Sequence, residues 1–228
     1  MNFDIKTLRN SKRISGAQKI SKKFAKELKQ SEDLALFLGM FAGDGCLTFN
    51  FNGDGNRIYP ISFFNCNKEY VVLFGTLFYK LFGIKGSILV SKRNNKRDLW
   101  HFQKYSKDIY NLVNNEFEIP NGKKALKVFI PSFILNGNSE LKKYFFLGYL
   151  ITDGGIRQTG DVMFHSASKN LIYDLKKLIE SVWGIKRQVK EYAQRGKFFS
   201  YQLTLNKAQA SIILPQLPTS HNLALRWP

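Results

Sequence analysis

The sequence predicts an α+β protein made of two similar halves, and three observations support this fold class. The chain has 228 residues, of which 44% are hydrophobic, so it can bury the core of one or two domains. Apolar residues follow a helical period in some segments and alternate with polar residues in others. The resulting order of elements, αββαββα, occurs once and then recurs.

The first helix of this pattern lies in the segment SEDLALFLGMFAGDG. Ser31 is suited to cap its N-terminus, and the two acidic residues that follow favour a first turn. The apolar period ends at Gly43–Gly45, where we expect the helix to stop. Residues 46–51 then alternate and predict a half-buried strand that turns Leu47, Phe49 and Phe51 toward the core.

The rest of the first half follows the same logic. The segment NGDGN (52–56) predicts a hairpin turn, and residues 57–65 predict the returning strand. Residues 68–83 predict a second helix that ends at a glycine. The segments SILVS and LWHFQKY predict another hairpin around a basic loop, and SKDIYNLVNNEF predicts the third helix.

The second half repeats the first at two fixed offsets. FLGMFAGDGC (37–46) aligns with FLGYLITDGG 109 residues later, and LFGIK aligns with VWGIK 101 residues later. The alternation of residues 100–103 is preserved in residues 201–204. We therefore divide the chain into a basic extension (1–30), a first repeat (31–129), a linker (130–142) and a second repeat (143–228).

The net charge of +18 indicates an anionic partner. Lys and Arg are spread along the whole chain, which favours nucleic acid over a membrane surface, and no run of about 18 apolar residues predicts a membrane span. The basic extension either packs on the domain or contacts phosphates. The two cysteines and three histidines lack metal-ligand spacing, and no signal peptide is visible, so we expect an intracellular, reducing location.

Each half contributes one apolar helix that ends in an acid, Asp44 or Asp153. Small residues spaced four apart would let the two helices pack closely; these are Gly39 and Gly43, then Gly148 and Thr152. The two carboxylates would then meet and repel each other, and Mg²⁺ would relieve the repulsion and support phosphodiester hydrolysis. Asp54, in the second Gly-Asp-Gly, has no counterpart and is expected to be a turn residue.

With both motifs in place, the chain resembles the LAGLIDADG homing endonucleases in their single-chain, two-repeat form, over about residues 31–215. The resemblance implies two αββαββα repeats, each with a saddle-shaped antiparallel sheet in the DNA major groove, packed through the motif helices. It also implies a monomer that cuts both strands of a long DNA site with Mg²⁺ and leaves 3′ overhangs. If each half covers one helical turn, the site is roughly 20 bp.

The resemblance also implies roles for individual residues. Asp44 and Asp153 would share two or three divalent ions, with the backbone carbonyls of Gly43 and Thr152. A polar residue followed by a lysine would order solvent, as Asn67–Lys68 and Ser168–Lys169 could. A basic residue after the third helix, Lys123 or Lys124, would complete the first pocket. The second half offers only His221 and Arg226 there, which puts equal activity on the two strands in question.

Strand alternation and loop position nominate residues for DNA contact. In the first half, the base-reading set is Thr48, Asn50, Arg57, Ser87, His101 and Gln103. In the second half, it is Arg157, Gln158, His165, Arg187, Lys190 and Gln202. The phosphate-contacting set is Lys92, Arg93, Lys96, Arg97, Arg195 and Lys197.

Three functions are compatible with these residues. The first is a site-specific DNA endonuclease, which both motif acids favour. The second is a maturase that binds intron RNA on the same scaffold. The third is a DNA-binding regulator without cleavage, although such a protein would be expected to have lost a motif acid. The compartment, cytoplasm or organelle matrix, depends on the host genome.

Overall fold

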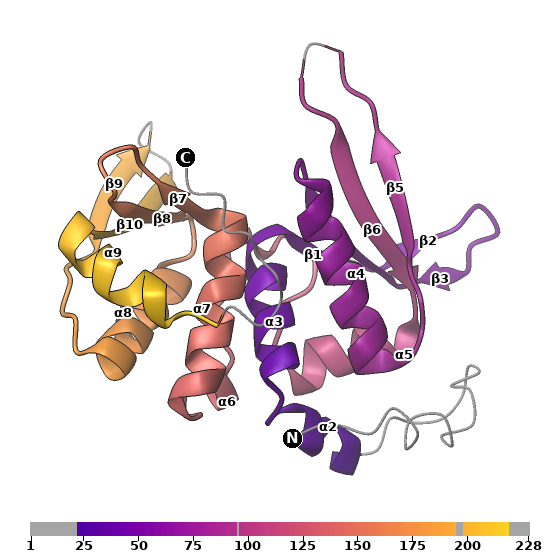
Figure 1. The fold of residues 1–228 in the computed structure, drawn as a ribbon. Helices are drawn as coiled ribbons and strands as arrows, with labels where there is room; N and C mark the ends of the chain where they lie inside the picture. Colours follow the sequence, from indigo (N-terminus) through magenta and orange to yellow (C-terminus); the bar gives the residue numbers. More distant parts are fainter. Residues whose placement is uncertain (1–21, 95, 195–197, 219–228) are drawn as a thin grey trace.

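The computed structural model describes residues 22–94, 96–194 and 198–218, and these form two repeats of αββαββα order (Figure 1). The fold class predicted from the sequence is therefore confirmed. The first repeat contains α3 (Glu32–Asp44), β1 (Gly45–Leu47), β4 (Pro60–Asn65), α4 (Lys68–Phe82), β5 (Ser87–Ser91), β6 (Leu99–Tyr105) and α5 (Lys107–Asn111). The second contains α7 (Ser139–Asp153), β7 (Gly154–Ile156), β8 (Val162–Ser166), α8 (Lys169–Trp183), β9 (Lys190–Gln194), β10 (Phe198–Leu205) and α9 (Lys207–Ile213).

The two sheets share one topology and one register. Their strand orders are β1-β4-β6-β5 and β7-β8-β10-β9, and all neighbours are antiparallel. Gly45 pairs with Phe63 in the first sheet, and Gly154 pairs with Phe164 in the second. The two sequence offsets of the repeat are therefore structural equivalences, strand by strand.

Helices α3 and α7 lie side by side at the centre of the molecule, and each repeat extends away from them (Figure 1). Their backbones touch where the glycines stand. A methyl group on Gly39 would overlap the carbonyl of Phe145, and one on Gly148 would overlap the carbonyl of Leu36. The predicted close packing of the two motif helices through small residues is confirmed.

Aromatic rings fill the core between the central helix and the sheet of the first repeat. Phe74 of α4 stacks on Phe37 of α3, with ring centroids 4.7 Å apart, and on Phe63 of β4 at 4.4 Å. In the second repeat Tyr149 of α7 stacks on Phe164 of β8 at 5.7 Å. The middle of each motif helix is thus buried, and the C-terminal ends of both helices lie beside the sheets.

The first hairpin differs from the prediction. β1 ends at Leu47, and β2 (Asn50–Phe51) and β3 (Arg57–Ile58) form a separate ribbon that projects from the repeat (Figure 1). Phe49 and Phe51 are 49% and 60% exposed, so the expectation that they face the core was wrong. The ribbon extends past the helices that would cover it, and the rings instead pack under the Arg57 guanidinium.

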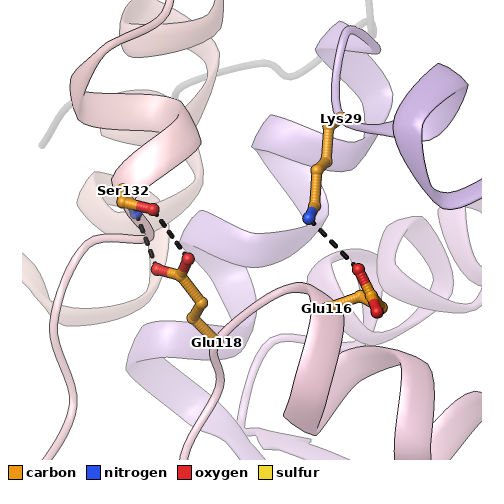
Figure 2. Close-up of polar contacts among 4 residues, drawn as sticks. All are labelled: Lys29, Glu116, Glu118 and Ser132. Carbon is orange, nitrogen blue, oxygen red and sulfur yellow. Dashed lines mark hydrogen bonds and ion pairs between the residues drawn. The ribbon is translucent and has the colours of Figure 1, made fainter. Parts of the chain in front are cut away.

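Five short elements before, between and after the two repeats complete the fold. They are α2 (Lys22–Leu28), η1 (Leu112–Glu116), η2 (Lys124–Leu126), α6 (Ser132–Leu135) and η3 (Leu214–Gln216). Figure 2 shows polar contacts that tie the linker, and the segment before α3, to the first repeat. Glu118 accepts hydrogen bonds from the backbone N–H and hydroxyl of Ser132, and Lys29 pairs with Glu116 at 3.4 Å.

The first repeat was expected to begin at residue 31, and α3 begins at Glu32. α7 begins at Ser139, so the end of the segment expected to be the linker is already helical. Most of the basic extension lies outside the described residues, which begin at Lys22. None of the helices in the described part of the chain is long and apolar enough to cross a membrane.

Candidate active site at the helix junction

The two motif acids lie together where α3 and α7 end. A methyl group on Gly43 would overlap the Thr152 side chain and come within 3.4 Å of the Asp153 carboxyl carbon. Burial raises the pKa of Asp44 to about 6, and the neighbouring Asp153 carboxylate adds to the rise. Burial also raises the pKa of Asp153. The pair is therefore short of compensating positive charge.

Lys124 supplies part of that charge. Its Nζ donates to the carbonyl oxygens of Phe41, Ala42 and Gly43 at 2.6, 2.8 and 2.7 Å. These carbonyls lie at the negative end of α3, where that of Phe41 also accepts from the Gly45 backbone N–H, and the ammonium caps the helix with all three of its protons. Burial lowers the pKa of Lys124 to about 8, although Asp153 and Asp44 favour its charged form.

Asn65 holds the first acid in place, and it was not nominated from the sequence. Its Nδ2 donates to Asp44 Oδ2 at 2.6 Å, and its Oδ1 accepts from the Asn67 backbone N–H at 2.7 Å. Ser166 occupies the same place in the second repeat, where its hydroxyl accepts from the Ser168 backbone N–H at 3.0 Å. Polar residues at the end of both β4 and β8 were the signal that could have identified this position.

The residues nominated to order solvent lie two positions further along the chain and cap helices. Asn67 Oδ1 accepts from the Glu69 backbone N–H at 2.9 Å, and Ser168 Oγ accepts from Leu171 at 3.3 Å. Their neighbours contact other groups: Lys68 Nζ lies 4.7 Å from the Trp100 ring centre, and Lys169 pairs with Glu191 at 3.4 Å. The structure does not bring these four side chains to the acids.

The second acid has different neighbours. Tyr149 is fully buried, and burial, together with Asp153, raises the pKa of its hydroxyl. This hydroxyl lies beside Asp153 and Ser166, yet within the described residues it forms no hydrogen bond of good geometry. Thr152 Oγ1 donates back to the carbonyls of Gly148 and Tyr149, both at 3.1 Å.

The two lysines nominated to complete the first pocket, Lys123 and Lys124, lie in different environments. Lys124 reaches the helix end, whereas Lys123 is exposed one residue earlier. For the second pocket, His221 and Arg226 lie outside the described residues.

The donor set fits a hard divalent cation. Within residues 22–218, leaving out the undescribed gaps, no three His, Cys, Asp or Glu side chains gather at one point. At the C-terminal ends of α3 and α7, the donors are two carboxylates and the carbonyl oxygens of Gly43 and Thr152. The Gly43 oxygen also accepts a hydrogen bond from Lys124. Oxygen donors of this kind suit Mg²⁺, which commonly completes its shell with water and phosphate.

The residues nominated for DNA contact lie on the outer faces of the sheets and on the hairpins. Phe102 of β6 packs on Phe74 of α4, so its neighbours His101 and Gln103 point to the opposite face. Exposed members of the set are Asn50, Arg57, Ser87, Lys92, Arg93, Lys96, Arg97, Arg157, Gln158, His165 and Lys190. Half-buried members are Thr48, His101, Gln103 and Arg187.

Four members of this set, Arg93, Arg157, Arg187 and Gln202, donate hydrogen bonds within the protein, and two others lie outside the described residues. Gln202 is 9% exposed and donates to Met163 Sδ and Thr204 Oγ1, both at 2.8 Å. Arg187 Nε donates to the Thr204 carbonyl at 2.8 Å. Arg195 and Lys197 fall in an undescribed gap.

Comparison with known proteins supports this reading of the fold. A family model described as a LAGLIDADG-like domain matches residues 140–215. No curated protein matches the sequence. The structure of I-DmoI with DNA and Ca superposes with a TM-score of 0.64 at 17% identity, over 85% of this chain and 92% of that chain. The structure of I-DmoI with DNA and Mn gives 0.62 at 16% identity, over 82% and 96%.

A third solved structure, the N-terminal LAGLIDADG domain of DUF199/WhiA, gives a TM-score of 0.50 at 13% identity, over 87% of this chain and 92% of that chain. I-DmoI is described as a homing endonuclease. Both similarities extend across the two repeats and the central helix pair. This chain is therefore a single-chain, two-repeat protein with the fold of the LAGLIDADG homing endonucleases, and its second repeat matches the LAGLIDADG-like domain.

Proposed function

We propose that this protein is a site-specific endonuclease that hydrolyses both strands of a DNA duplex of roughly 20 bp with a divalent metal ion. The observation that carries the proposal is the pairing of Asp44 and Asp153 at the junction of the two repeats. Both carboxyls have a raised pKa because they are desolvated, and that of Asp44 is raised further by Asp153. Such a pair is poised to bind a cation.

Asp44 and Asp153, with the carbonyls of Gly43 and Thr152, would hold Mg²⁺ ions. When bound, the metal activates water and stabilises the leaving oxygen of a phosphodiester. The chain contributes orientation and charge around these ligands. Asn65 fixes the Asp44 carboxylate by its hydrogen bond, and Lys124 holds the end of α3 while placing a positive charge near both acids.

DNA is the substrate that the charge distribution favours. The net charge of +18 is large for a chain of this size, and the exposed outer faces and hairpins carry arginines and lysines. Structures of I-DmoI contain its DNA together with Ca or Mn, which supports the same class of ligand for a protein of this fold. The duplex would lie across both sheets with its centre at the helix junction.

The test begins with selection of bound sequences from a randomised duplex pool without metal, followed by cloning of the selected site in a supercoiled plasmid. With Mg²⁺, the wild type should linearise this plasmid. Asp44→Asn and Asp153→Asn should bind the site but cut it at least about 100-fold more slowly, in the range expected for loss of transition-state stabilisation. Asp54→Asn, which makes the same change at the hairpin tip, should cut like the wild type.

Two outcomes would contradict the assignment. If both motif variants cut normally, the acids do not have these roles. If the wild type binds the duplex but cuts in neither Mg²⁺ nor Mn²⁺, the protein is not an endonuclease under these conditions. A splicing assay with intron RNA then decides whether the alternative, a maturase on the same scaffold, applies.

A further inference from the structure

We propose that the first repeat recognises thymine in its half of the DNA site, through contacts between thymine 5-methyl groups and an apolar row on the outer face of its sheet. The row consists of two apolar side chains, Phe64 and Leu89, with the flat His101 imidazole between them, and we call it the apolar row. This inference rests on the proposed function, because it places that face in the major groove of a duplex.

The apolar row crosses three neighbouring strands. Phe64 of β4 pairs with His101 of β6, and His101 pairs with Leu89 of β5. Directly opposed residues in a sheet share a face, so the three side chains stand next to each other. The Phe64 ring stacks on the His101 imidazole with centroids 5.5 Å apart and planes at 23°.

This row is not part of the core. Its neighbours Phe63 and Phe102 are fully buried under α4, so the row lies on the opposite side of the sheet. Phe64 is 37% exposed and Leu89 is 46% exposed. A helix covers only the inner face, which means that these apolar groups are exposed for contact with a partner.

The surroundings of the row favour DNA as that partner. One step along the sheet lies a polar row of Ser62, Gln103 and Ser87, in which Ser62 is buried, Gln103 is half-buried and Ser87 is exposed. On the other side, the Arg93 guanidinium reaches Cys66 Sγ at 3.2 Å, which brings a positive charge to this face. An apolar strip between hydrogen-bonding groups and a cation matches a major groove, in which methyl groups lie between polar base edges and phosphates.

The equivalent row of the second sheet has the opposite character. His165 of β8 pairs with Gln202 of β10, which pairs with Lys190 of β9. These positions correspond one by one to Phe64, His101 and Leu89 through the 101-residue offset. The two halves of the target should therefore differ, with a dependence on thymine methyls only in the half bound by the first repeat.

Thymine is the base that presents a methyl group in the major groove, and deoxyuridine removes this methyl while keeping every hydrogen-bonding group. The experiment measures binding of the selected duplex without metal, after all thymines of one half at a time are replaced by deoxyuridine. In one half, affinity should fall about fourfold for each contacted methyl. In the other half, the change should stay under about twofold by the same scale.

Variants assign the effect to the apolar row. Phe64→Ala and Leu89→Ala should each weaken binding to the thymine duplex and reduce the difference between thymine and deoxyuridine. Tyr79→Ala removes an aromatic ring that is 50% exposed, more than Phe64, on α4 at the inner side of the sheet, and should leave that difference unchanged. Melting curves check that each variant is folded.

The results separate two failures. If the wild type binds no duplex, the proposed function fails and the recognition of thymine fails with it. If the wild type binds and cuts, but deoxyuridine is tolerated in both halves, only the recognition of thymine is overturned. It is also overturned if Phe64→Ala and Leu89→Ala keep the full sensitivity to deoxyuridine.

Discussion

The two repeats hold their motif acids in the same place but surround them differently. Asp44 accepts a hydrogen bond from Asn65 and ends a helix capped by Lys124. Asp153 lies beside the Tyr149 hydroxyl instead, although the Lys124 charge lowers its pKa too. Tyr149 corresponds to Met40 in the first repeat. The comparison teaches that pseudo-symmetry fixes where the acids meet, while the groups that tune them differ between the halves.

The largest effect should follow from disrupting the close contact between α3 and α7, which both repeats share. Gly148→Val places a branched side chain against the Leu36 carbonyl and the Met40 backbone, which cannot move without separating α3 from α7. We expect a loss of about 3 kcal/mol or more in the free energy of unfolding, measured by urea denaturation. Gly75→Ala, a helical glycine of α4 outside this interface, should change it by less than about 1 kcal/mol.

Removing Lys124 should change both acids, because its charge acts on each of them. Lys124→Met removes the cation that lowers the pKa of both carboxyls, so both pKa values should rise, which carbon-detected NMR titrations would measure. Cleavage should fall by about 100-fold if the charge also acts in the transition state. Lys123→Met is the matched control. An equal loss of cleavage rate in that variant would contradict a specific role for Lys124.

Substitutions at the equivalent residues Asn65 and Ser166 test whether the two halves contribute unequally to cleavage of the two DNA strands. Asn65→Ala removes a hydrogen bond to a partly buried carboxylate, worth about 1.5–3 kcal/mol, so the pKa of Asp44 should rise. Cleavage of one strand should slow by at least about tenfold, measured with each strand labelled separately. Ser166→Ala should slow the other strand less. Equal slowing of both strands by each variant would mean that the two pockets act as one.

Asp44 should also make stability depend on pH in the metal-free protein. Its pKa is 3.8 ordinarily and about 6 in the fold, so the folded state binds the proton more tightly than the unfolded chain. Stability from this group is therefore lost as pH rises through that window. Asp44→Asn should be more stable than the wild type by about 1 kcal/mol near pH 7, with no difference near pH 3. A difference of the opposite sign would contradict the raised pKa.

The smallest effect should come from the group that belongs to the second repeat alone. Tyr149→Phe deletes a buried hydroxyl that has no well-formed hydrogen bond to the described residues. Because an unsatisfied buried hydroxyl is costly, the metal-free variant should gain up to about 1 kcal/mol in thermal or urea unfolding. A clear loss of stability would show instead that the hydroxyl has a firm partner, with Asp153 as the nearest choice.

Most helix ends and the equivalence of the two repeats were predictable, because they follow from patterns of neighbouring residues in the sequence. Ser31 does cap α3, Gly83 and Gly184 end α4 and α8 in the left-handed conformation, and the repeat offsets match the strand register. The meeting of Asp44 and Asp153 followed from the glycine spacing. These features depend on local backbone rules and on one helix contact.

What the sequence did not reveal depends on register and on the extent of helix cover. Asn65, not Asn67, reaches Asp44, because the pairing of Gly45 with Phe63 places the end of β4 beside the end of α3. Alternation predicted that Phe49 and Phe51 would be buried, but a strand pattern cannot tell where the covering helices stop. Phe64 was missed for a related reason: of two adjacent phenylalanines in one strand, one must point outward.

The backbone contact between Gly39 and Gly148 lets the two sheets vary independently of each other. Since the two motif helices meet through main-chain atoms, side chains on either sheet can change without moving the proposed metal site between Asp44 and Asp153. Each sheet is then free to acquire a new base preference by itself. Hybrid proteins that join the first half of this chain to the second half of a relative should keep a working geometry wherever the relative carries the same pair of glycines.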